Sequence, residues 1–213
     1  MKNAPDNRFK PRFQNVSQRA PPTQSDSYAA VEPNGGQKVH ALPFPNGFYR
    51  IIVRGNQTNK QLTVIEGLVY INEGARLHYH MYEDEMFFVV NGSLQFYVDG
   101  KQFCANAGTT VYIPRNVTQS VRNINSKPTH VQILFLPSGR EDFLEKVSII
   151  NDNPPINATQ TNHLALQYGQ VNLGEVSKWE DLNCVSEGSV VVKLSFHLLF
   201  LMFLSFAFNV LFS

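Results

Sequence analysis

Two histidines and a glutamate, His78, His80 and Glu85, stand close together in the middle of the chain. Alternate residues of a β-strand point to the same face, so the imidazoles of His78 and His80 project to one side. Glu85 then returns from the start of the following strand. Two neutral imidazole nitrogens and one carboxylate oxygen form a ligand set that suits Fe(II), and also Mn, Co, Ni or Zn, with positions left open for water, dioxygen or substrate.

Short β-branched and aromatic runs surround this group, and they predict the strands that must position it. Asn91-Gly92 and Asp99-Gly100 are hairpin signals on either side of an alternating strand. The pattern is typical of an all-β barrel or sandwich. Strands are expected at residues 48–53, 62–71, 85–90, 93–98, 110–113 and 130–136.

The spacing around the histidines resembles the first sequence signature of the cupin superfamily. That signature has two histidines one residue apart, a glutamate five positions after the second histidine and a glycine seven positions after the glutamate, and His78, His80, Glu85 and Gly92 match it. Gly74 lies closer to His78 than the leading glycine of the signature, which indicates a shortened turn.

Residues 108–123 resemble the second signature, which carries a glycine, a strand with a proline, a fourth ligand histidine and an asparagine. Gly108, Pro114 and Asn123 match it, whereas Gln119 stands where the histidine belongs. A carboxamide oxygen is a poorer ligand than imidazole for a late transition metal, so the affinity for metal is expected to fall. The candidate metal ligands are therefore His78, His80, Glu85 and Gln119.

The resemblance implies an all-β fold, the double-stranded β-helix or jelly-roll barrel of RmlC-like cupins, over residues 41–139. From about residue 45 to residue 170 the arrangement resembles the single-domain quercetin 2,3-dioxygenase-like cupins of the cupin 2 type, in which a metal binds a flavonol or another enolisable substrate and dioxygen cleaves its ring. This implies a metal-dependent oxygenase acting on a small aromatic or enolisable substrate. Glu85 would serve as a ligand and also as the catalytic base.

Gln119 leaves two alternatives open. In the first, His78, His80 and Glu85 hold a metal, and Gln119 hydrogen-bonds a bound water, dioxygen or substrate. In the second, the pocket is metal-free, and the protein is a non-catalytic small-molecule-binding cupin tethered to a membrane. His130 could replace the missing ligand, but an exposed position is expected for it. The expected pocket walls, which favour an aromatic or apolar ligand, are Phe87, Val89, Phe96, Tyr112 and Val121.

The regions outside the barrel differ from it in composition. Residues 1–40 are rich in Pro, Asn, Gln, Ser and Arg and are expected to be disordered. Residues 140–189 form a helical extension and linker, with short helices at 141–147 and 163–169 that pack outside the barrel and could form a homodimer interface. The two cysteines, Cys104 and Cys184, are not expected to form a disulfide framework.

The C-terminal residues 190–213 are strongly apolar and are predicted to be a membrane segment, such as a transmembrane helix, or an anchor signal. A tail anchor would leave the barrel in the cytosol. Small residues at 186–189 resemble a GPI-attachment signal, although no apolar leader follows Met1. Five N-glycosylation sequons would suit a secreted surface, but an Asn-rich chain also produces them by chance; they begin at Asn15, Asn56, Asn91, Asn116 and Asn157.

The overall charge restricts the class of partner. Lys and Arg total 18 against 17 for Asp and Glu, so no basic surface argues for nucleic acid. The 213 residues suit one globular domain with tails. A small molecule is therefore the expected partner.

Overall fold

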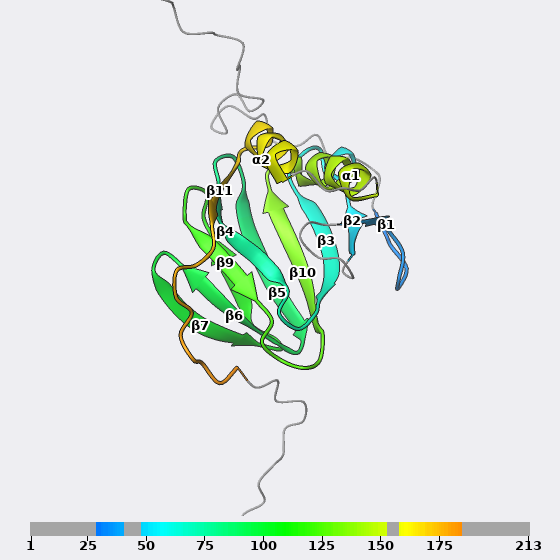
Figure 1. The fold of residues 1–213 in the computed structure, drawn as a ribbon. Coiled ribbons are helices and arrows are strands. Elements are labelled where there is room, and N and C mark those ends of the chain that lie inside the picture. Colours follow the sequence, from blue (N-terminus) through cyan, green and yellow to red (C-terminus); the bar gives the residue numbers. More distant parts are fainter. Residues whose placement is uncertain (1–28, 41–47, 153–157, 185–213) are drawn as a thin grey trace, which may run out of the picture.

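The computed structural model describes residues 29–40, 48–152 and 158–184, which form two antiparallel sheets with two helices at one end (Figure 1). The first sheet has the order β1-β2-β3-β10-β5-β8 and the second the order β11-β4-β9-β6-β7. The strands of the first sheet are β1 Gln37–Val39, β2 Tyr49–Val53, β3 Thr63–Val69, β5 Asp84–Asn91, β8 Thr110–Ile113 and β10 Thr129–Leu136. Those of the second are β4 Gly74–His80, β6 Ser93–Val98, β7 Lys101–Asn106, β9 Gln119–Arg122 and β11 Gln170–Gly174.

Alternating side chains of both sheets meet to form the core. In β10, which pairs with β3 and β5, buried and half-buried residues alternate along the whole strand. Its inward residues Val131, Ile133 and Phe135 join the same buried cluster as Leu94 and Phe96 of β6. Two sheets with apolar inner faces bury one core between them, and the predicted all-β jelly roll is confirmed.

The two predicted hairpin turns have different outcomes. Asp99-Gly100 joins β6 to β7 with both residues at positive φ, which confirms the hairpin. Asn91-Gly92 was expected to do the same, but β5 and β6 belong to different sheets, so this prediction was wrong. Gly92 has a φ of 89°, and a Cβ there would lie 2.7 Å from Oγ1 of Thr129. The glycine lets the chain turn closely past Thr129 as it changes sheets.

The N-terminal boundary lies earlier than predicted. Residues 1–40 were expected to be disordered, yet Gln37–Val39 pair with β2 as an edge strand. Val39 is buried and joins the core. The barrel therefore includes the end of the N-terminal segment 1–40, whose polar composition did not predict a strand.

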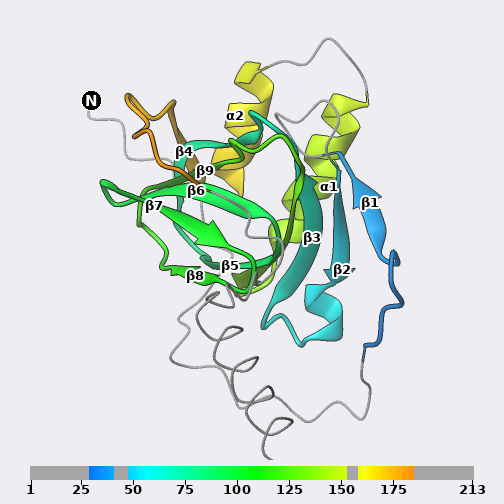
Figure 2. The same cartoon turned by 90° about the horizontal axis from the view of Figure 1, so that it is seen from below.

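The C-terminal extension is more structured than its sequence indicated. The helices are longer than predicted, α1 spanning Arg140–Asn151 and α2 Ala158–Gln167. They cover one end of the two sheets (Figures 1 and 2). After α2 the chain forms β11, which was not predicted and which pairs with β4. The extension therefore belongs to the barrel architecture, because it adds a strand to the second sheet.

Residues 175–184, which we call the strap, follow β11 and pack across the second sheet. Nε2 of Gln102 donates to the carbonyl of Lys178 at 2.9 Å, and the guanidinium of Arg122 lies 4.5 Å from the ring centre of Trp179. The strap ends at a disulfide between Cys104 and Cys184. The expectation that these cysteines do not pair was wrong, because the strap brings together positions 80 residues apart.

No helix within the part of the chain that the structure describes is both long and apolar enough to cross a bilayer. The predicted membrane segment at residues 190–213 lies outside the described residues, as do the sequons at Asn15 and Asn157.

Candidate metal centre and cavity

Strands β4 and β5 bring the predicted triad together. His78 and His80 alternate along β4 and both point inward, while Glu85 lies at the start of β5. Nε2 of His80 is 3.2 Å from Nε2 of His78 and 3.1 Å from Oε2 of Glu85. All three side chains are buried, and their ligand atoms lie within 4.8 Å of one another. The structure therefore has a possible His-His-Glu metal site.

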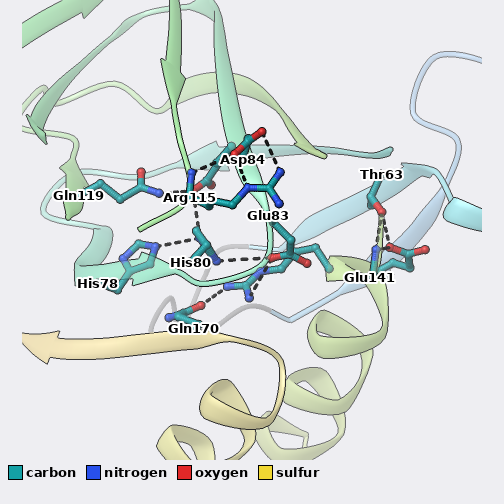
Figure 3. A network of polar contacts seen from close by, with 12 residues as sticks. Thr63, His78, His80, Glu83, Asp84, Arg115, Gln119, Glu141 and Gln170 are labelled. Atoms are coloured by element: carbon teal, nitrogen blue, oxygen red, sulfur yellow. Dashed lines mark hydrogen bonds and ion pairs between the residues drawn. The ribbon is translucent and has the colours of Figure 1, made fainter. Parts of the chain in front are cut away.

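The Nδ1 atoms of His78 and His80 face other protein groups, which leaves both Nε2 atoms for a metal. Nδ1 of His78 lies 2.6 Å from the carbonyl of Arg76, so it carries the proton and donates it. Nδ1 of His80 faces Oε2 of Glu83 at 3.5 Å (Figure 3). Metal-binding histidines characteristically direct the second nitrogen to a carbonyl or carboxylate in this way. The donor set and its surroundings thus fit a divalent transition metal.

Burial sets the protonation of the site. It lowers the pKa of His78 to about 4 and also lowers the pKa of His80 well below its usual value. Burial raises the pKa of Glu85, against the opposing effects of His78, Arg140 and Gln119. Both imidazoles are consequently neutral near pH 7, which is the form that binds a metal.

The two residues considered for the fourth ligand lie in different places. Gln119 is buried on β9 opposite His78, and its Nε2 donates to Oε2 of Glu85 at 2.5 Å. His130 lies 2.5 Å from Oε1 of Glu66 and takes no part in the group around His78. His130 is half-buried rather than exposed as expected, and it lies outside the site. Gln119 contacts the triad by donating to the carboxylate of Glu85.

A cavity of about 320 Å³ opens beside the triad between the sheets and the helices. Of the five predicted wall residues, Phe87 and Val121 line it. Val89 and Phe96 are completely buried in the core instead, and Tyr112 is 53% exposed, so these three predictions were wrong. The sequence could not place them, because a strand pattern separates inner from outer faces but does not show where the core leaves space.

Helices α1 and α2 and strand β11 supply the part of the cavity wall that sequence reasoning missed. Arg140 is 6% exposed, lines the cavity and donates from Nη2 to Oε1 of Gln170. Glu83, 3% exposed, lies behind His80 with its Oε2 3.9 Å from Nη1 of Arg140. The sequence did contain one signal for Arg140. It is the first residue of α1, and a positive charge in the first turn of a helix is unfavourable because it opposes the helix dipole, so a role other than helix stability is indicated.

The chain is similar to known proteins over part of its length. Residues 67–136 match the family model described as Cupin domain. Over 99 residues the chain is 29% identical to the quercetin 2,3-dioxygenase of Bacillus subtilis (strain 168), a match that covers 45% of this chain and 28% of that relative. The chain therefore matches well under two thirds of the length of this curated relative.

Solved structures with similar folds share little sequence with the chain. KdgF from Halomonas sp. is 15% identical, with 54% of this chain and 99% of that chain covered and a TM-score of 0.47. A predicted oxalate decarboxylase from Thermotoga maritima is also 15% identical, with 51% and 98% covered and a TM-score of 0.46.

Proposed function

The chain belongs to the cupin superfamily through its cupin domain at residues 67–136, and on that premise we propose that it is a metal-dependent oxygenase acting on a small aromatic or enolisable substrate. One observation carries the proposal. The ligand atoms of His78, His80 and Glu85 converge within 4.8 Å at the wall of a cavity of about 320 Å³. A ligand set beside a space of this size suits chemistry on a small molecule.

His78, His80 and Glu85 would hold the metal. A divalent transition metal supplies Lewis acidity and, for a redox-active ion, electron transfer to dioxygen. Glu85 is the candidate base, because its carboxylate lies at the cavity wall beside the two imidazoles, where it can take a proton from a substrate hydroxyl. Gln119 fixes the carboxylate by donating to its Oε2. Glu83 faces Nδ1 of His80 and favours the proton at that atom.

The apolar walls would select the substrate and exclude water. Ile65, Phe87, Ile133 and Phe135 line the cavity from the first sheet, and each is almost completely buried. Such surfaces favour a flat apolar or aromatic body. They also lower the local dielectric, which strengthens the electrostatic effect of every charge at the site.

Gln119 supports the second candidate, a metal-free binding protein. Its amide already occupies Oε2 of Glu85, an oxygen within reach of the histidines. A protein that never binds metal could use this polar group to orient a small molecule directly. Tethering through residues 190–213 and assembly into a homodimer stay predictions from the sequence.

Metal content separates the two candidates. We expect the purified full chain to hold about one equivalent of a transition metal, His78→Ala to hold none, and His130→Ala, the matched control, to equal the natural protein. Dioxygen uptake with a small aromatic substrate that carries a hydroxyl, such as salicylate, should follow the same order. A natural protein that stays empty while Gln119→His fills would refute the oxygenase and support the metal-free binder.

A further inference from the structure

A buried guanidinium with an unsatisfied donor belongs to the wall of the cavity beside the candidate metal centre. Arg140 is 6% exposed, and its Nη1 has no hydrogen-bond partner among the described residues. Its nearest anion is Oε2 of Glu83, at 3.9 Å from Nη1, which itself lacks a hydrogen bond within the same residues. A buried charge without full hydrogen bonding is strongly unfavourable. The position therefore calls for a further partner.

The orientation of this guanidinium is fixed on several sides. Its centre lies 4.2 Å from the ring centre of Phe143 and 5.5 Å from that of Phe135, both within cation–π range. Nη2 is held by Oε1 of Gln170. Gln170 in turn donates to Asn172 at 2.6 Å. A planar donor held in this way is prepared to bind an anion, because little side-chain freedom remains to be lost on binding.

The net charge around the cavity also favours an anionic ligand. When ionised, Arg140 contributes one positive charge and Glu83 and Glu85 together two negative charges, while the charge of Arg76 at the cavity wall is offset by its ion pair with Glu175. A divalent cation at His78, His80 and Glu85 would leave the site with a net charge of +1. One negative charge on the ligand would then neutralise the site, which is favourable in a buried space.

We propose that Arg140 is the anchor of a carboxylate-binding subsite, and that the substrate is a small apolar or aromatic monocarboxylate. A carboxylate offers two oxygens to the guanidinium fork. The ligand body would pack against apolar cavity walls, including Leu144 and Val147 of α1. This inference rests on the proposed function, because it defines the substrate class of the same site.

Benzoate and its neutral counterpart benzamide are the probes that test the subsite. On metal-loaded full-length protein we expect benzoate to bind about 10- to 100-fold more tightly than benzamide by isothermal titration calorimetry, the range for a charge-assisted hydrogen bond. Arg140→Met should abolish the preference, and Arg140→Lys should retain part of it because the charge remains without the fork. Arg50→Gln, which removes an arginine outside the cavity, should behave like the natural protein.

Equal affinities for the two probes in the natural protein would overturn the subsite, and so would an unchanged preference in Arg140→Met. Thermal melting of each variant shows whether it is folded, and Arg140→Lys keeps the test valid if Arg140→Met is not. Metal content, and dioxygen uptake with the hydroxylated substrate salicylate, are measured on the same samples. Benzoate preference without dioxygen uptake would refute the oxygenase alone, whereas uptake without the preference would refute the subsite alone.

A second observation, independent of the cavity, concerns maturation. The Cys104–Cys184 disulfide links β7 to the strap, and disulfides persist mainly in oxidising compartments. The three described sequons present exposed asparagines, Asn56, Asn91 and Asn116. None of these side chains lines the cavity, and none forms a side-chain hydrogen bond with another described residue. Each therefore has room for a glycan without disturbing the site.

From the disulfide and the sequons together we infer that the chain matures in the secretory pathway and carries N-glycans at Asn56, Asn91 and Asn116. Protein isolated from its own cells should lose mass on treatment with peptide-N-glycosidase F. In the full chain expressed in eukaryotic cells, Asn56→Gln, Asn91→Gln and Asn116→Gln should each remove one glycan. Asn106→Gln, an exposed asparagine outside any sequon, should remove none.

Thiol labelling completes this test. Without reductant, Cys104 and Cys184 should resist alkylation in the unfolded native protein, and with reductant both should react. Unchanged mass after glycosidase treatment of the native protein would overturn the glycosylation, and free thiols in the unreduced protein would overturn the oxidising compartment.

Discussion

Buried polar side chains are fully hydrogen-bonded at the end of the barrel where β10 begins, which we call the closed end. Asn123 is completely buried and donates to the carbonyls of Val69 at 2.8 Å and Lys127 at 2.9 Å. Oγ1 of Thr129 donates to the carbonyl of Ser93 at 2.8 Å. At the cavity end, beside the helices, His80, Glu83 and Arg140 each have a buried atom without a hydrogen bond among the described residues.

This difference distinguishes buried polar side chains that stabilise the fold from buried polar side chains that are available to a ligand. A satisfied buried group stabilises one arrangement of the chain, whereas an unsatisfied one destabilises the fold unless something binds to it. Two adjacent residues of α1 illustrate the contrast. Glu141 accepts from the backbone nitrogens of Gly55 and Gly139 and from Thr63, while Nη1 of Arg140 has no such partner in the described structure. We conclude that Glu141 holds the helix in place and that Arg140 serves a ligand.

Truncation of the closed-end core should have the largest effect. Phe96 is completely buried, with its ring centre 5.1 Å from that of Phe87 and 5.6 Å from that of Phe103. Phe96→Ala should lower the free energy of unfolding by about 4 kcal/mol, because a large cavity forms where packing is tight. Phe88→Ala, at a position 39% exposed, should lower it by less than about 1 kcal/mol. Urea denaturation measures both, and similar losses would contradict the tight packing assigned to the closed end.

Loss of a fully hydrogen-bonded polar side chain at the closed end should have the second largest effect on the free energy of unfolding. Asn123→Ala should lower the free energy of unfolding by about 3 kcal/mol, because a buried hydrogen bond to the carbonyl of Val69 is lost together with two partly buried ones, to the carbonyl of Lys127 and from the amide of Asn125. Asn106→Ala, at an exposed position, should change it by less than about 0.5 kcal/mol. Urea denaturation of the pair tests this, and a loss below about 1 kcal/mol for Asn123→Ala would show that the network contributes little.

Removal of the two incompletely paired charges should instead raise the free energy of unfolding. Glu83→Gln/Arg140→Met should raise the free energy of unfolding by about 2 kcal/mol in metal-free protein, because two incompletely paired buried charges become neutral. The same variant should lose its preference for benzoate over benzamide. Urea denaturation of the metal-free protein gives the first result, and calorimetry after metal loading gives the second. A destabilised variant would show that these charges support the fold.

The triad was predictable from the sequence because its spacing resembles the first cupin signature and because the two histidines share one strand. Alternation along one strand places His78 and His80 on the same face, and Glu85 follows after a short turn. The fold class was predictable for a similar reason, since apolar alternation marks strands without any knowledge of their partners. Alternation alone could not bring Glu85 to the histidines, because β5 lies in the other sheet, so for that step the prediction depended on the resemblance.

The predictions that failed concern features that depend on the tertiary structure. Asn91-Gly92 has the composition of a hairpin, but the strands it joins lie in different sheets. Cys104 and Cys184 pair only because the strap crosses the second sheet. Arg140 enters the site through a helix that follows the predicted barrel, so no spacing rule connects it to His80. Sequence patterns give faces and turns, whereas the pairing of distant segments depends on the whole fold.

The smallest predicted effect tests whether the two ends differ in packing as well as in polarity. Ala105, at the closed end, and Ala165, on α2 at the cavity, are both almost completely buried. Ala105→Leu should lower the free energy of unfolding by about 1.5 kcal/mol, because the tight core has no room for the added carbons. Ala165→Leu should change it by less than about 1 kcal/mol and weaken benzoate binding, because the larger side chain enters a space of about 320 Å³. Equal destabilisation by both substitutions would mean that the cavity end is packed as tightly as the closed end, leaving no room there for a substrate.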